Sequence, residues 1–176
     1  MFKFIVWRVH LLRRKDETQV TDTTDEKATD QAAAENISLE DALKVFTDKY
    51  PDASIEEVSF DVDNKVAKYE IEAFDDSNEY EMEISAKDGS IIKDKSEKDN
   101  TANKKAIDTS LISKVDDFVA ETIKDAGPDY YLDSYSIDYE ESGAYTKLEI
   151  EVENSNGKDI EYKYNMETSE LIKKDL

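Results

Sequence analysis

Apolar and polar side chains alternate along much of this chain, with the two-residue period of β-strands. Residues 67–74 (AKYEIEAF) and residues 146–153 (TKLEIEVE) show nearly the same alternation, 79 positions apart. Each run is followed by a polar turn, a second alternating run and a short apolar segment. A repeat of this length with the same internal order predicts two copies of one supersecondary unit.

A helical pattern precedes each set of strands. Ser38 is a suitable N-cap for the first helix, and Pro51 ends it because the residue before a proline disfavours the helical conformation. Its apolar face consists of Leu39, Ala42, Leu43, Phe46 and Tyr50. The second helix begins near Asp108 and ends at Gly127. Its apolar face consists of Leu111, Ile112, Val115, Phe118, Val119 and Ile123.

The strands are expected in the same order after each helix, around residues 58–62, 69–73, 80–86 and 91–92, and again around 135–139, 148–152, 160–166 and 171–172. This order predicts an α+β fold of two units, each one helix packed on a three- to four-stranded antiparallel sheet. We place the units at residues 37–97 and 108–176, with a connector at 98–107.

The chain is strongly acidic, with 23 Lys and Arg against 44 Asp and Glu and a net charge of −21 over 176 residues. Such a charge repels phosphate backbones and anionic lipid surfaces, which argues against nucleic-acid binding. A cationic partner, a basic protein surface and divalent cations remain compatible with it.

Residues 1–36 differ from the rest. Five of the basic groups and no acid lie in residues 1–15, whose uncharged runs are too short for a membrane span and lack the features of a signal peptide. We favour a truncated or misassigned start over a short basic membrane anchor, the other interpretation. Residues 16–36 contain almost no large apolar side chains, and we expect a disordered acidic linker.

The residues needed for common enzyme chemistry are missing. The chain has no cysteine and a single histidine, His10, which excludes thiolate sites, a His-Glu-x-x-His zinc motif and a histidine-dependent triad. Asp61 and Asp63 open a segment like a calcium-binding loop, but Lys65 and Val66 occupy positions that need an oxygen ligand and glycine. We therefore predict no catalytic residue, no metal site, no cofactor and no enzymatic activity.

Glutamates alternate with the apolar side chains of the central strands. If Tyr69, Ile71 and Met82 point at the helix, the glutamates share the opposite face. The predicted interaction face consists of Glu70, Glu72, Glu81, Glu83, Glu149, Glu151 and Glu161. Such a run is usually a solvated surface, and the alternative is a docking surface for a basic partner or loosely held cations.

The tyrosines divide into two groups. Most occupy inward strand positions and are expected in the core, namely Tyr69, Tyr80, Tyr135, Tyr139, Tyr162 and Tyr164. Tyr130 and Tyr131 follow the second helix, where we expect an exposed loop.

Several landmarks of the first unit occur in a familiar order: a Ser-Leu-Glu-Asp-Ala helix start, Tyr50-Pro-Asp-Ala53, Glu57-Val-Ser-Phe-Asp61, two Tyr-Glu strands, and Ala86-Lys-Asp-Gly-Ser-Ile-Ile92. This succession resembles the PepSY domain, whose last turn usually reads Asp-Ala-x-x-Gly-x-Ile/Val; here Ser85 replaces the aspartate. Residues 108–176 resemble a divergent second copy, in which Thr168-Ser169-Glu170 replaces the glycine turn.

The resemblance implies a cystatin-like arrangement, with a curved antiparallel sheet wrapped over the helix. It also implies an extracytoplasmic or cell-envelope setting in bacteria and kinship with the propeptides of thermolysin-like metallopeptidases, for which a role in restraining peptidases has been proposed. The family has no established catalytic residues that could be carried over to this sequence.

We therefore predict a non-catalytic, monomeric cell-envelope or secreted protein that acts by protein–protein contact and modulates or inhibits a peptidase. Contact would use the acidic face or an open sheet edge. The alternative is an extracytoplasmic module that binds a cation or ligand without a peptidase partner, and a third possibility is a structural spacer in the cell envelope.

Overall fold

The computed structural model describes residues 36–63, 66–98 and 104–176. Outside these ranges lie the predicted N-terminal segment and acidic linker and the middle of the connector. Two residues of the turn that resembles a calcium-binding loop also lie outside them. No helix in the described ranges combines the length and apolarity needed to cross a membrane.

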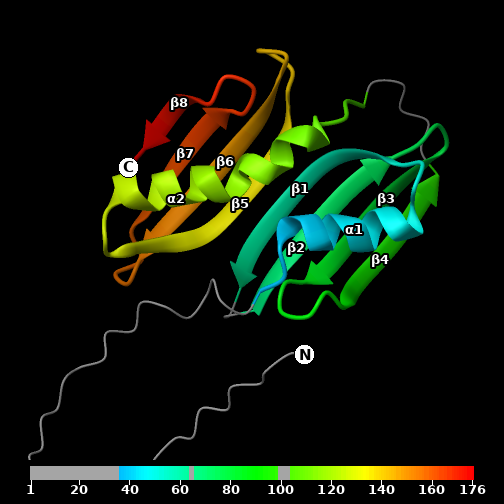
Figure 1. Ribbon diagram of the computed structural model, residues 1–176, viewed down its shortest axis with the longest axis horizontal. Helices are drawn as coiled ribbons and strands as arrows, with labels where there is room; N and C mark the ends of the chain where they lie inside the picture. The colour runs from blue at the N-terminus through cyan, green and yellow to red at the C-terminus, as the bar shows by residue number, and fades with distance from the viewer. Residues whose placement is uncertain (1–35, 64–65, 99–103) are drawn as a thin grey trace, which may run out of the picture. The chain divides into compact units, whose positions relative to one another are not determined.

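The described residues form two helical segments, each followed by four strands (Figure 1). The first half (residues 36–98) contains α1 (Leu39–Lys49), β1 (Ser54–Asp63), β2 (Val66–Phe74), β3 (Asn78–Ser85) and β4 (Ile91–Lys98). The second half (residues 104–176) contains η1 (Thr109–Lys114), α2 (Val115–Ala126), β5 (Tyr130–Glu140), β6 (Tyr145–Asn154), β7 (Asp159–Asn165) and β8 (Glu170–Asp175). The predicted order of one helix followed by strands is therefore present in both halves.

All eight strands belong to one antiparallel sheet in the order β4-β3-β2-β1-β5-β6-β7-β8. The prediction of an α+β antiparallel fold is confirmed, but the prediction of a separate sheet for each unit is wrong, because β1 pairs with β5. That pairing is symmetric about Ser59 and Ser136: Val58 lies opposite Ile137, and Phe60 lies opposite Tyr135. The two halves therefore meet through equivalent strands, as two subunits meet at a two-fold axis.

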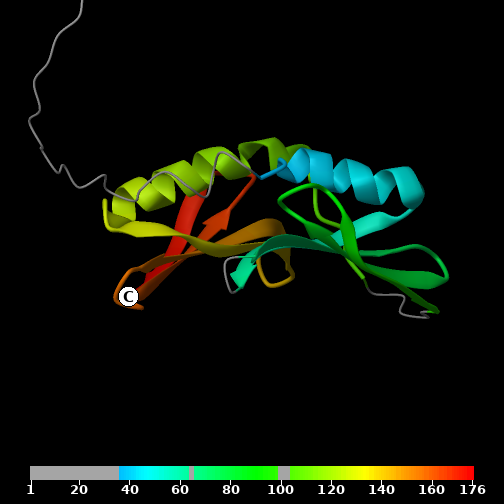
Figure 2. The same ribbon diagram turned by 90° about the horizontal axis from the view of Figure 1, so that it is seen from below.

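Both helical segments cover the same face of the sheet (Figure 2). The inward side chains of both halves join one hydrophobic core, in which Ile71, Ile84, Ile150 and Tyr162 are completely buried. The alternation in the sequence therefore predicted the buried side of the six inner strands, β1–β3 and β5–β7, correctly.

The two helices begin differently. Ser38 caps α1 as predicted: its hydroxyl accepts a hydrogen bond from the backbone N–H of Asp41 at 3.1 Å. The second helical segment instead starts with the 3₁₀ helix η1, where Asp108 accepts a hydrogen bond from the backbone N–H of Ser110 at 3.0 Å. Gly127 ends α2 with a φ of 114°, in a region that side chains disfavour.

The C-terminal end of each helix is bonded to the edge strand of its own half. The hydroxyl of Tyr50 donates to Asp94 on β4 at 2.7 Å, and Lys49 forms an ion pair with the same carboxylate. In the second half the charges are exchanged, because Asp125 on α2 pairs with Lys174 on β8 at 2.7 Å. These contacts hold two edge strands whose residues are all exposed.

Candidate functional site: the open face of the sheet

The sheet has one face without helices, which we call the open face (Figure 2). It carries the side chains that alternate with the core residues, and all seven glutamates of the predicted interaction face lie on it. Glu72 and Glu161 are exposed and the other five are half-buried. Cross-strand register pairs Glu70 with Glu83, Glu72 with Glu81, and Glu151 with Glu161. The predicted face is thus brought together in two groups, one in each half.

In the first half, Glu70, Glu81 and Glu83 form a compact group whose carboxylate oxygens lie within 4.8 Å of one another. Two lysines reach this group: Lys93 pairs with Glu81 and Glu83, and Lys68 lies 3.3 Å from Glu83. Burial and a hydrogen bond with Glu81 raise the pKa of Glu70, whereas the hydrogen bond from Lys93 lowers the pKa of Glu81. The two lysines therefore neutralise much of the charge of this group.

In the second half, Glu149 is also matched by lysines. Its carboxylate lies 2.8 Å from Lys163 and 2.9 Å from Lys147, and Lys147 also pairs with Asp138 at 3.1 Å. Burial alone would raise the pKa of Glu149, but the hydrogen bonds from Lys163 and Lys147 outweigh it and lower the pKa. This glutamate is held in its charged form.

No lysine or arginine in the described ranges forms an ion pair with Glu72, Glu151 or Glu161. Glu70 also lacks an ion pair, but it is hydrogen-bonded to Glu81 within the group that the two lysines reach. Burial raises the pKa of Glu151, and the nearby carboxylates of Asp133 and Asp159 raise it further. Glu72, Glu151 and Glu161 are therefore the glutamates of the predicted face that lie outside the lysine-bound groups.

The sequence did not reveal a partly buried ion-pair network near the N-terminal end of β1. Lys104, from the connector, lies 2.6 Å from Glu56 and 2.7 Å from Glu79. Its ammonium nitrogen also lies 5.9 Å from the centre of the Phe74 ring. Nothing in the local pattern marks this site, since Lys104 is 48 positions from Glu56 and the β-bulge that turns Glu56 toward it is not visible in the sequence.

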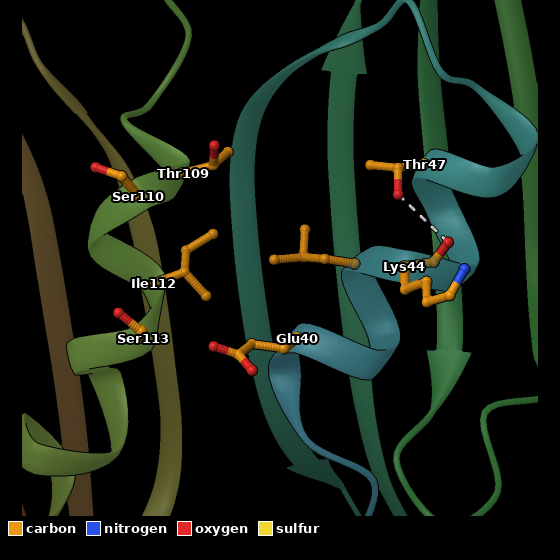
Figure 3. Close-up of a pocket in the computed structure, with 8 residues that line it drawn as sticks. Glu40, Lys44, Thr47, Thr109, Ser110, Ile112 and Ser113 are labelled. Atoms are coloured by element: carbon orange, nitrogen blue, oxygen red, sulfur yellow. Dashed lines mark hydrogen bonds between the residues drawn. The ribbon is translucent and has the colours of Figure 1, made fainter.

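A groove of about 440 Å³ lies on the helical side, between α1 and η1 (Figure 3). Leu43 and Ile112 supply its apolar part, and the remaining lining is polar or charged: Glu40, Lys44, Thr47, Thr109, Ser110 and Ser113. The Thr47 hydroxyl donates to the carbonyl oxygen of Lys44 at 3.4 Å. The helical layer and the sheet separate this groove from the open face, and none of the predicted site residues lines it.

The sequence predicted that Tyr130 and Tyr131 lie in a loop, but in the structure they begin β5. Tyr131 is 48% exposed, and its hydroxyl donates to Glu153 at 3.2 Å. The strand starts earlier than expected because β6 offers backbone partners for both residues, at Asn154 and Glu153.

The fold and the open face together define a two-layer α+β protein in which helices cover one side of a single sheet. The family model described as "Peptidase propeptide and YPEB domain" (PepSY) matches residues 36–95. The predicted resemblance of the first half to a PepSY domain is therefore confirmed. The match does not extend into residues 104–176, so a second PepSY copy stays a prediction.

The fold is similar to that of a solved structure, the crystal structure of a "putative lipoprotein" from Clostridium difficile 630, with a TM-score of 0.63. Its sequence is 23% identical, and the alignment covers 80% of this chain and 93% of that chain. No curated protein matched the sequence.

Proposed function

We propose that this protein is a non-catalytic, extracytoplasmic PepSY protein that binds a peptidase through the open face and restrains its activity. The PepSY match supports the class, since that family is described by its occurrence in peptidase propeptides. The observation that carries the proposal is the open face itself, where Glu72, Glu151 and Glu161 lie on a helix-free surface and form no ion pair within the described part of the chain.

The open face supports contact better than the sheet edges do. Both edge strands contain a register shift, between Ile91 and Lys93 on β4 and between Leu171 and Lys173 on β8. Bulges and lysines on an edge disfavour the addition of another strand. A partner is therefore expected to lie across the face instead of extending the sheet.

An extracytoplasmic setting is the second part of the proposal. It is supported by the PepSY domain and by the name of the structurally similar clostridial protein. We infer that the chain meets secreted or envelope peptidases there, and its net charge of −21 favours a partner with a basic surface.

The test is an inhibition assay with the full chain, a secreted thermolysin-like metallopeptidase and a fluorogenic peptide substrate. We expect inhibition by the wild-type chain and weaker inhibition by the triple variant Glu72→Gln, Glu151→Gln, Glu161→Gln. Each of the three glutamates is expected to form one surface ion pair with the peptidase, worth about 0.5 kcal/mol. The loss of all three corresponds to about a tenfold higher concentration for half-inhibition.

The matched control carries the same charge change away from the open face: Asp52→Asn, Glu121→Gln and Glu141→Gln, all exposed residues of turns or of α2. This variant should inhibit like the wild type. Equal weakening by both triple variants would show that only net charge matters, and a wild-type chain that neither binds nor inhibits the peptidase would refute the proposal.

A further inference from the structure

Lys104 shows how this fold holds an ammonium group. Its nitrogen lies between the carboxylates of Glu56 and Glu79, at 2.6 Å and 2.7 Å, beside the Phe74 ring. The lysine side chain is 18% exposed. Two carboxylates and an aromatic ring at one end of the sheet therefore form a binding site for a primary amine.

The second half contains the same positions. Glu56 lies at the register shift between Ile55 and Glu57 on β1, and Asp133 lies at the corresponding shift between Leu132 and Ser134 on β5. Phe74 pairs with Glu79 across β2 and β3, as Glu153 pairs with Asp159 across β6 and β7. Asp133, Glu153 and Asp159 are thus the structural equivalents of Glu56, Phe74 and Glu79.

The chemical setting of the second site is also similar. Burial raises the pKa of Asp133, and the charges of Glu153, Asp61 and Asp159 raise it further. No lysine or arginine of the described segments forms an ion pair with Asp133, Glu153 or Asp159. An aromatic ring is present as well, because the hydroxyl of Tyr131 donates to Glu153.

We propose that Asp133, Glu153 and Asp159 bind the side-chain ammonium of a lysine from the protein partner, as Glu56 and Glu79 bind Lys104. This inference rests on the proposed function, because it assumes a protein that lies on the open face. An ammonium suits the site better than a metal ion does. Within the described ranges, the carboxylates close enough to share one ion are those of Glu70, Glu81 and Glu83, and this site is not among them.

The experiment titrates the ¹⁵N-labelled full chain with the peptide acetyl-Gly-Lys-Gly-amide and follows the backbone amide signals by NMR. We expect shifts concentrated at Asp133, Glu153 and Asp159, and their loss in the double variant Asp133→Asn, Asp159→Asn. The same peptide with an acetylated lysine side chain should produce none of these shifts.

Lys104→Ala provides the internal positive control. Removing the resident ammonium should make Glu56 and Glu79 accessible, so the lysine peptide should now shift the amides of both residues as well. If the peptide shifts the amides of Glu56 and Glu79 but leaves those of Asp133, Glu153 and Asp159 unaffected, the inference is wrong, because the assay has then detected lysine binding at the first site alone.

Two further outcomes would overturn it. Shifts spread evenly over the open face would indicate unspecific attraction, and stronger local shifts with calcium chloride at matched ionic strength would indicate a divalent-cation site.

The peptidase assay separates this inference from the proposed function. If the peptide does not bind but Glu72→Gln, Glu151→Gln, Glu161→Gln still weakens inhibition, only the lysine site fails; if the peptide binds but no peptidase is inhibited, only the proposed function fails.

Discussion

Thr122 on α2 is completely buried, although threonine is a polar residue in the middle of a helix. Its hydroxyl lies 2.9 Å from the hydroxyl of Tyr164 on β7, and this pair joins the helix to the sheet inside the core. A buried hydroxyl that loses its partner costs more than the hydrogen bond itself, because water cannot replace the partner.

We predict that Tyr164→Phe destabilises the protein by about 1–3 kcal/mol, since it leaves the Thr122 hydroxyl without that partner. Adding Thr122→Val removes the stranded hydroxyl, so the double variant should be less destabilised than the sum of the two single variants. Urea unfolding of the four proteins measures this coupling. Strictly additive losses would mean that the two hydroxyls do not stabilise each other.

The sequence predicted the direction of these side chains but not their partners. A period of two placed six tyrosines inward. Tyr69, Tyr135, Tyr162 and Tyr164 are buried, whereas Tyr80 and Tyr139 are only half-buried. The hydroxyl partners come from distant elements: Ile37 for Tyr69, Asp125 for Tyr162 and Thr122 for Tyr164. Such pairings depend on how the helices cross the strands, and no local pattern records that.

At the scale of single elements, β6 presents two glutamates in opposite electrostatic settings. Glu149 is paired with two lysines, whereas Glu151 lies opposite Glu161 and near Asp133. The sequence repeats Glu-Ile-Glu in both halves and gives no sign of this difference. The lysines that neutralise Glu149 come from a neighbouring strand and from its own, and their reach depends on the register.

We predict that Glu151→Gln stabilises the protein at pH 7, by about 0.2–1 kcal/mol, because it removes like-charge repulsion across strands. The pKa of Glu151 is raised in the folded state, so its charged form destabilises the fold and this penalty disappears as the pH falls through the folded pKa. The advantage of the variant should therefore vanish near pH 3, as measured by unfolding at both pH values.

Glu149→Gln is the matched control on the same strand. The pKa of Glu149 is lowered in the folded state, so its charged form stabilises the fold above the unfolded-state pKa, and that contribution is lost as the pH falls. The variant should be destabilised at pH 7 and similar to wild type at low pH.

A salt titration of the wild type checks the Glu151 prediction separately. Added salt should raise the wild-type unfolding midpoint if repulsion dominates the open face; a falling midpoint would contradict the Glu151 prediction.

Element boundaries were predictable where side chains pack and less so elsewhere. The ends of α1 follow from Ser38 and Pro51, and both were placed correctly. β4 is longer than the Ile91-Ile92 pair expected from the sequence, because its lysines and acids extend along β3 without entering the core. The 3₁₀ start of the second helical segment was also missed, since its apolar residues fit an α-helical face equally well.

At the scale of the whole molecule, the pairing of β1 with β5 decides the architecture. Each meander has two edges, and the sequence does not say which edge stays open, since hydrogen bonds between strands leave no mark in the alternation of side chains. Ser59 and Ser136 at the centre of the seam are small and polar and would suit a solvent-exposed edge equally well. The repeat was therefore visible, whereas its merger into one sheet was not.

One sheet and one core predict that the two halves unfold together. Ile71 and Ile150 are equivalent, completely buried residues on β2 and β6, one in each half. Replacing either by alanine should cost about 2–5 kcal/mol through lost burial and the cavity left behind. If the β1–β5 seam couples the halves, each substitution will lower the urea midpoint of amide signals from both halves equally.

The expected result is a single transition in an NMR-monitored urea titration for wild type, Ile71→Ala and Ile150→Ala. Ser136→Pro serves as the seam variant, because proline removes a backbone donor in a central strand. It should lower both midpoints or separate them. If Ile71→Ala shifts only the signals of residues 36–98, the seam transmits little stability, and each half folds on the core beneath its own helix.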